Sequence, residues 1–194
     1  MPILKKRKVE LFLVVFLFAL YTFSRLGALT NIPIFTDEAI YLRWAQIAES
    51  DANWRFISLT DGKQPLFIWL TMLAMKIIPD PLIAGRMISV LSGLLTAIGL
   101  FFLSREIFQE KWIGIIAAGL YVIYPFALIY DRLALYDSLV GTFAVWSLYG
   151  TVCLVRALRL DVALLLGLAI GGAVLNKTSG FFQSLSSPFC ITYF

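Results

Sequence analysis

The segment LIAGRMISVLSGLLTAIGLFFL, residues 82–103, decides the fold class of this chain. It contains one charged residue, Arg86, close to its beginning. A bilayer core is about 30 Å thick and a helix rises about 1.5 Å per residue, so about 20 apolar residues cross it. Applied along the chain, this measure predicts five spanning helices, near residues 10–29, 82–103, 112–130, 138–155 and 162–175. We therefore expect an all-α, polytopic transmembrane helix bundle.

The composition of the whole chain agrees with a membrane protein surrounded by lipids. Hydrophobic residues make up 60% of the 194 positions and charged residues 14%, and the mean hydropathy is +0.87. The net charge of +4 does not indicate a nucleic-acid partner, because its largest cluster, residues 5–8, directly precedes an apolar run. Such a cluster is typical of the cytoplasmic end of a first helix. The poor cleavage sequence SRLGA favours an uncleaved helix over a signal peptide.

Metal-binding patterns are absent from the sequence. The chain has no histidine, and Cys153 and Cys190 form no spacing for a metal or a disulfide framework. These facts argue against a zinc site of the usual kind. The sequence identifies no cofactor with certainty, although carboxylates would suit a hard divalent cation.

The short apolar segment 65–78 decides the topology. It contains Lys76 and lies between prolines, and it is too short to span comfortably, so we expect it to lie at the interface. With 65–78 outside the bilayer core, the basic loops 104–111 and 156–161 fall on the cytoplasmic side with the N-terminus. The loop 30–81, the turn 131–137 and the region after Asn176 then share the extracytoplasmic face.

The first extracytoplasmic loop contains adjacent acids in the stretch IFTDEAIYLRWAQIAE. Thr36 is a candidate helix cap, and Asp37 and Glu38 would complement the dipole of a helix that lies flat on the membrane. Helix initiation alone is a sufficient reason for both acids. Their position at the mouth of a membrane bundle also makes a functional carboxylate plausible, with Asp37 as the candidate.

Further charged residues fall on the same predicted side. Lys63, in the turn DGKQP, is either a solvated loop residue or a cation for a lipid phosphate. Asp131 is either a partner of Arg132 or a site residue, but Asp137 is the better second acid. Lys177 is either a snorkelling lysine or a phosphate ligand, and it follows Asn176 in a glycosylation sequon. Arg25 and Arg86 either snorkel or add to one positive pocket.

Taken in order, the segments FTDEAIYLRWAQIAE, DGKQPLFIWL, AGRMISVLSGLLTAIGLFFLSREIF, YDRLALYDSLVGTFAVWSLYG and GLAIGGAVLNKTSGFF resemble one enzyme family. The chain is similar to the amino-terminal part of polyprenyl-phosphate-sugar glycosyltransferases with the GT-C fold, which include protein O-mannosyltransferases and lipid A aminoarabinose transferases. The resemblance covers about residues 25–182. It implies that the chain lacks a carboxyl-terminal part and is inactive by itself. Gln64 departs from the proline that relatives often have.

The resemblance implies an inverting transfer from a polyprenyl-phosphate donor to a hydroxyl of a protein, lipid or glycan acceptor. It implies Asp37 as the catalytic base. Donor phosphate binding is expected from Lys63, Arg132 and Lys177, and orientation of the acceptor or base from Glu38 and Asp137. The implied location is the cell membrane, with the site extracytoplasmic. A transporter or a structural membrane subunit is the alternative, but the span centres are almost free of charge.

Overall fold

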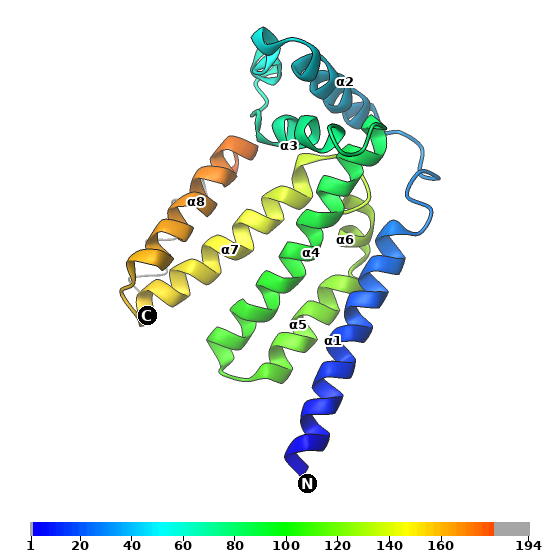
Figure 1. Cartoon of the computed structure of the whole chain (residues 1–194). Coiled ribbons are helices and arrows are strands. Elements are labelled where there is room, and N and C mark those ends of the chain that lie inside the picture. Colours follow the sequence, from blue (N-terminus) through cyan, green and yellow to red (C-terminus); the bar gives the residue numbers. More distant parts are fainter. Residues whose placement is uncertain (1, 181–194) are drawn as a thin grey trace.

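The computed structural model describes residues 2–180, and every regular element in that range is helical. Within residues 2–180, three helices are long and apolar enough to cross a membrane: Lys8–Leu26 within α1 (Pro2–Leu26), α4 (Pro81–Phe108) and α7 (Tyr136–Arg156). The shorter apolar helices α5 (Lys111–Ile123) and α8 (Leu160–Asn176) run beside them (Figure 1). The all-α, polytopic bundle is therefore confirmed.

Small residues hold α4 and α7 close together. Gly93 of α4 faces the carboxylate of Asp131, in the turn before α7, with no room for a side chain, and a Cβ on Gly99 would lie 2.8 Å from Val145 of α7. The hydroxyls of Thr96 and Thr142 lie 3.0 Å apart across the same interface. Close backbone approach through small residues and hydroxyl hydrogen bonds is typical of helix packing in membranes.

The segment 112–130, expected as one span, is broken in two. Tyr124 has an extended backbone, with φ −65° and ψ 122°, between α5 and α6 (Pro125–Tyr130). Pro125 causes the break, because proline disfavours the helical conformation of the residue before it and has no N–H to donate. The chain therefore changes direction before the turn that leads into α7.

A cap of short helices lies across one end of the bundle (Figure 1). It consists of α2 (Thr36–Ser50), η1 (Ala52–Trp54), η2 (Ile57–Asp61) and α3 (Leu66–Met75). The ten residues of α3 would measure about 15 Å, half of a bilayer core. The helix α3 packs against α2, and the placement of residues 65–78 outside the bilayer core stays a prediction.

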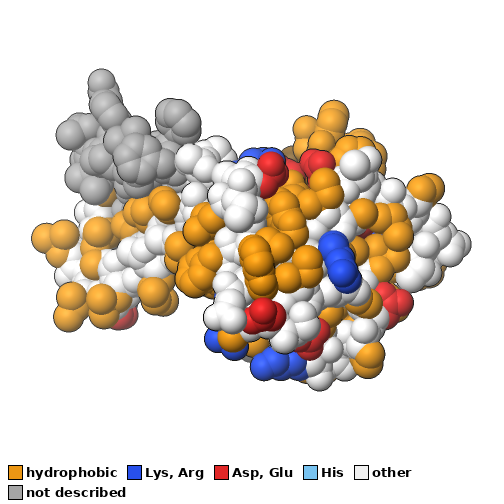
Figure 2. All heavy atoms as spheres, turned by 90° about the horizontal axis from the view of Figure 1, so that it is seen from above, with side chains coloured by type: hydrophobic (Ala, Val, Ile, Leu, Met, Phe, Trp, Pro, Cys, Tyr) orange, Lys and Arg blue, Asp and Glu red, His pale blue; other side chains and the backbone are white. Residues whose placement is uncertain are grey.

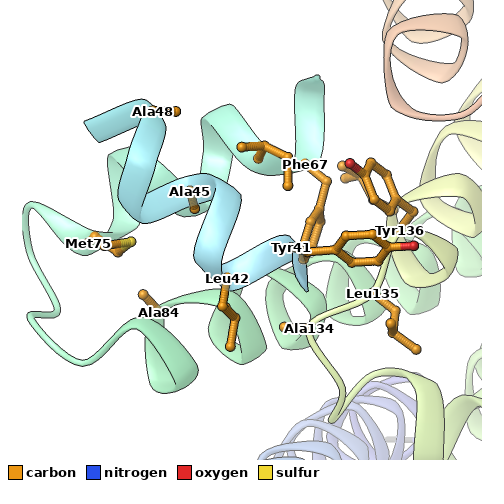
Figure 3. Packing of buried hydrophobic residues seen from close by; sticks show 12 residues of the cluster. Tyr41, Leu42, Ala45, Ala48, Phe67, Met75, Ala84, Ala134, Leu135 and Tyr136 are labelled. Atoms are coloured by element: carbon orange, nitrogen blue, oxygen red, sulfur yellow. The ribbon is translucent and has the colours of Figure 1, made fainter. Parts of the chain in front are cut away.

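The cap has its own hydrophobic core, which extends into the start of α7 (Figure 3). Phe67 and Ile68 of α3 are fully buried in it, and Leu42 and Ala45 contribute from α2. Leu135 and Tyr136, at the beginning of α7, close the cluster. The cap is thus fixed to the end of the bundle at the place where α7 begins.

Candidate active site

A polar pocket of about 390 Å³ lies between the cap and the beginning of α7 and the end of α8. This volume falls within the range of about 300–1,000 Å³ that is usual for small-molecule sites. Figure 2 looks down on the capped end, where acidic and basic side chains lie next to one another among hydrophobic ones. The pocket brings together four of the six predicted site residues: Asp37, Lys63, Asp137 and Lys177.

Asp37 reaches the pocket from the first turn of α2, where its side chain is exposed. The N-terminal end of a helix carries a partial positive charge, which favours an ionised carboxylate there. Thr36 is not the cap: Phe35 is the N-cap residue, and its N–H donates to Oε2 of Glu38 at 3.3 Å. Glu38 thus fixes the turn from which Asp37 projects.

Glu38 itself lies outside the pocket lining, fully buried beside Arg86. Its Oε1 accepts from Nε of Arg86 at 2.7 Å, and its Oε2 accepts from Nη2 at 2.8 Å. The N–H of Ala134 donates to Oε1 at 2.8 Å. Burial by itself would raise the pKa of Glu38, but the Arg86 guanidinium and the backbone N–H donors hold it below its ordinary value.

Lys63 is presented by a tight turn between η2 and α3. Gly62 has a left-handed backbone, with φ 69°, which glycine adopts without strain. The N–H of Lys63 donates to Ser58 O at 3.0 Å, and the hydroxyl of Tyr136 donates to Gln64 O at 3.0 Å. Among the described residues no acidic side chain forms an ion pair with Lys63, so its ammonium group is free to bind an anion in the pocket.

Asp137 and Lys177 meet across the pocket from α7 and α8. Nζ of Lys177 lies 2.8 Å from Oδ1 of Asp137, and the two side chains are 47% and 44% exposed. Asn176, the residue before Lys177, donates from Nδ2 to Tyr136 O at 3.1 Å and is fully buried. The sequon at Asn176 is therefore a poor acceptor for glycosylation, because its amide nitrogen is enclosed and already bonded.

Arg132 lies outside this pocket lining. Its Nη2 donates to Gly27 O at 2.8 Å and Ala28 O at 3.0 Å, so it secures the chain between α1 and α2. Asp131, the suggested partner of Arg132, instead faces Arg25, with 3.5 Å between Oδ2 and Nε, and both are buried. Arg25 and Arg86 are thus committed to buried ion pairs, and neither lines the pocket.

Tyr41, Tyr136 and Asn176 line the pocket but were missed as site residues in the sequence. The rings of Tyr41 and Tyr136 pack edge to face, 4.7 Å apart at an angle of 85° (Figure 3). Burial raises the pKa of Tyr41 to about 12, with a smaller contribution from nearby carboxylates. Tyr41 is therefore a neutral hydroxyl at physiological pH. In the sequence, only the position of Tyr41 one helical turn after Asp37 indicated that Tyr41 could belong to the site.

A metal site finds limited support in the geometry. Within residues 2–180, no group of three or more carboxylate, thiol or imidazole side chains is placed to hold a metal ion. Two carboxylates, Asp37 and Asp137, do share the pocket. A divalent cation bound there would need substrate oxygens among its ligands, and it stays a prediction.

The fold and the pocket define a class of protein: a multi-helix membrane protein with a charged site at one end of its bundle. A family model described as "Dolichyl-phosphate-mannose-protein mannosyltransferase" matches residues 62–187, more than half of the chain. The chain therefore belongs to this family and is a membrane glycosyltransferase of the mannosyltransferase type. The resemblance seen in the sequence is confirmed. Comparisons with curated proteins and with solved structures found no match.

Proposed function

We propose that this protein transfers a mannose-type sugar from a polyprenyl-phosphate donor to an acceptor hydroxyl, with inversion, at the extracytoplasmic face of the cell membrane. The observation that carries the proposal is the meeting of Asp37, Lys63, Asp137 and Lys177 in one pocket from four separate segments. The family description supports a mannosyl phospholipid donor and a protein acceptor. Asp37 lies outside the matched residues, so its role rests on the pocket.

In the proposed reaction, the acceptor oxygen attacks the anomeric carbon as the bond from that carbon to the phosphate oxygen breaks. The bonding electrons leave with the polyprenyl phosphate, and the hydroxyl proton passes to the carboxylate of Asp37. One displacement inverts the anomeric centre. Asp37 suits the role of base because it is exposed in the pocket and its neighbour Glu38 is held by four hydrogen bonds.

Lys63 and Lys177 would stabilise the charge that develops on the leaving phosphate. Lys63 has no acidic partner among the described residues, whereas Lys177 is already oriented by Asp137. We therefore assign Asp137 the role of positioning Lys177 in the absence of donor. Glu38 and Arg132 take positioning roles, because one fixes the first turn of α2 and the other fixes the connection between α1 and α2.

The direct test is sugar transfer by the full-length protein in liposomes with polyprenyl-phosphate mannose and a Ser/Thr-rich peptide. Asp37→Asn should lower kcat by about a hundredfold or more, since a general base contributes about 10²–10⁴. Glu49→Gln is the matched control, because Glu49 is an exposed acid on the same helix outside the pocket. Equal activity of Asp37→Asn and the control would reject Asp37 as the base.

The sidedness of the pocket has its own test. The starting protein has Cys153 and Cys190 replaced by Ser. Single cysteines at exposed Asn53, in η1 of the cap, and Thr178, just after α8, report on the pocket end. A single cysteine at exposed Glu110 reports on the connection between α4 and α5, at the opposite end of the bundle (Figure 1). A membrane-impermeant thiol reagent applied to intact cells should label the first two and spare the third. Labelling of Glu110→Cys alone would place the pocket on the cytoplasmic side and overturn the proposed location.

A further inference from the structure

The side-chain amide of Asn176 is only half satisfied. Its Nδ2 donates to Tyr136 O at 3.1 Å, while Oδ1 is buried and receives no hydrogen bond from the described residues. Asn176 is fully buried yet forms part of the pocket lining. A buried acceptor without a donor is unfavourable and uncommon in native proteins. On the wall of a ligand pocket, a ligand that supplies the missing hydrogen would relieve that cost.

The chemical structure of the proposed polyprenyl-phosphate sugar determines which of its groups can supply the missing hydrogen. The polyprenyl chain is apolar, and an ionised phosphodiester only accepts hydrogen bonds. The acceptor hydroxyl gives its proton to Asp37 in the proposed reaction. On the polyprenyl-phosphate sugar itself, the remaining groups that can donate a hydrogen bond are the hydroxyls of the sugar ring. The adjacent residue in the sequence, Lys177, is one of the two proposed phosphate ligands, so phosphate and sugar would contact consecutive residues.

The neighbouring side chains suit the same ligand. Tyr136 lines the pocket and uses its hydroxyl hydrogen on Gln64 O, so its oxygen is left as an acceptor. Tyr41 adds a second hydroxyl and an aromatic surface to the wall. This part of the wall is neutral, whereas the charged side chains are exposed. The hydroxyls of a sugar ring can donate hydrogen bonds to such acceptors, whereas a carboxylate cannot.

We propose that Oδ1 of Asn176 accepts a hydrogen bond from one hydroxyl of the donor sugar, which makes Asn176 a specificity-determining residue. This inference rests on the proposed function and names the group that the pocket recognises. The inference predicts that the protein prefers donor sugars that carry the hydroxyl bound by Asn176 over sugars that lack it. Removing either the Asn176 amide or the sugar hydroxyl should lower kcat/KM for the sugar donor. Once one of the two is removed, removing the other should have no further effect.

The test is a cycle between the residue and the hydroxyl, measured as kcat/KM with the full-length protein in liposomes. The donors are polyprenyl-phosphate mannose and each of its monodeoxy analogues. One analogue should be used about tenfold less well than mannose by the unmodified protein, as expected for a buried acceptor left unpaired. For Asn176→Ala, kcat/KM with the mannose donor should fall by a similar factor, and kcat/KM with that analogue should equal its kcat/KM with the mannose donor.

Thr71→Val is the matched control. Thr71 has a fully buried hydroxyl without a hydrogen bond among the described residues, and it does not line the pocket. This variant should keep the full discrimination against the deoxy analogue. If Asn176→Ala does not fold, the analogue series with the unmodified protein still tests the inference.

The outcomes separate the two proposals. Use of all monodeoxy donors within about twofold of mannose, or the same discrimination in Asn176→Ala as in the unmodified protein, would overturn the role of Asn176 and leave the proposed function intact. Absence of mannose transfer by the unmodified protein would overturn both.

Discussion

Replacing Glu38 by Ala should destabilise the protein severely, although Glu38 does not line the pocket. The change removes four acceptor contacts: two to Arg86, one to Ala134 N–H and one to Phe35 N–H. It leaves a fully buried guanidinium without its counter-charge. Breaking a buried ion pair by removing one partner costs about 3–5 kcal/mol in free energy of unfolding. For a chain of this size, the expected fall in Tm is on the order of 10 °C.

The assay is thermal unfolding in mild detergent, with Glu106→Ala as the matched control. Glu106 also pairs with an arginine, Arg156, at 3.0 Å, but the two side chains are 33% and 41% exposed. An exposed pair contributes about 0–1 kcal/mol, so the control should unfold within a few degrees of the unmodified protein. Equal effects of Glu38→Ala and Glu106→Ala would refute the reasoning that burial makes the Glu38 pair structural.

The same ion pair predicts a pH dependence. The pKa of Glu38 is lower in the folded protein than in the unfolded chain. Its contribution to stability is therefore fully present above the unfolded pKa and is lost as the pH falls through the folded pKa. Tm should thus decline in acid below the ordinary glutamate range, and Glu38→Gln should show a smaller decline. An unchanged acid profile in Glu38→Gln would contradict this assignment.

The remaining predictions concern packing and the pocket. Gly93→Ala should cost about 1–3 kcal/mol, because its Cβ would collide with the carboxylate of Asp131. Gly141→Ala should be neutral or stabilising by up to about 1 kcal/mol, since its Cβ would meet nothing within 4 Å and alanine favours helices. Thermal unfolding that ranks the two alanine variants equally would contradict both. Tyr136→Phe should raise KM for the lipid donor a few-fold, because the turn before α3 loses the bond to Gln64 O at 3.0 Å. An unchanged KM would show that this bond does not hold the turn.

Sequence reasoning identified the bundle because apolar length and loop charge are local quantities. The same reasoning expected the segment 112–130 to be one helix, although Pro125 already indicated a break. Hydropathy does not distinguish a helix from two shorter helices of the same composition. The preference of the residue before proline for an extended backbone was the signal that should have weighed more.

The partners of buried charges could not be predicted from spacing. Arg86 and Glu38 are 48 residues apart, and their pairing depends on how the cap packs on α4. Asp131 stands next to Arg132 in the sequence, but it faces Arg25 of α1 instead. Asn176 was noticed as part of a sequon, whereas its half-satisfied amide becomes visible only once α8 is placed against α7.

Two pairs of acids at this end of the bundle, Asp37 with Glu38 and Asp131 with Asp137, are arranged in the same way. Successive helical residues point about 100° apart, so Asp37 faces the pocket while Glu38 turns inward to Arg86. A turn separates Asp131, buried against Arg25, from Asp137 in the pocket. In each case a buried carboxylate with an arginine fixes the backbone from which an exposed carboxylate projects. The buried arginines at this end of the bundle therefore pair with the carboxylates that fix these segments, and neither arginine lines the pocket.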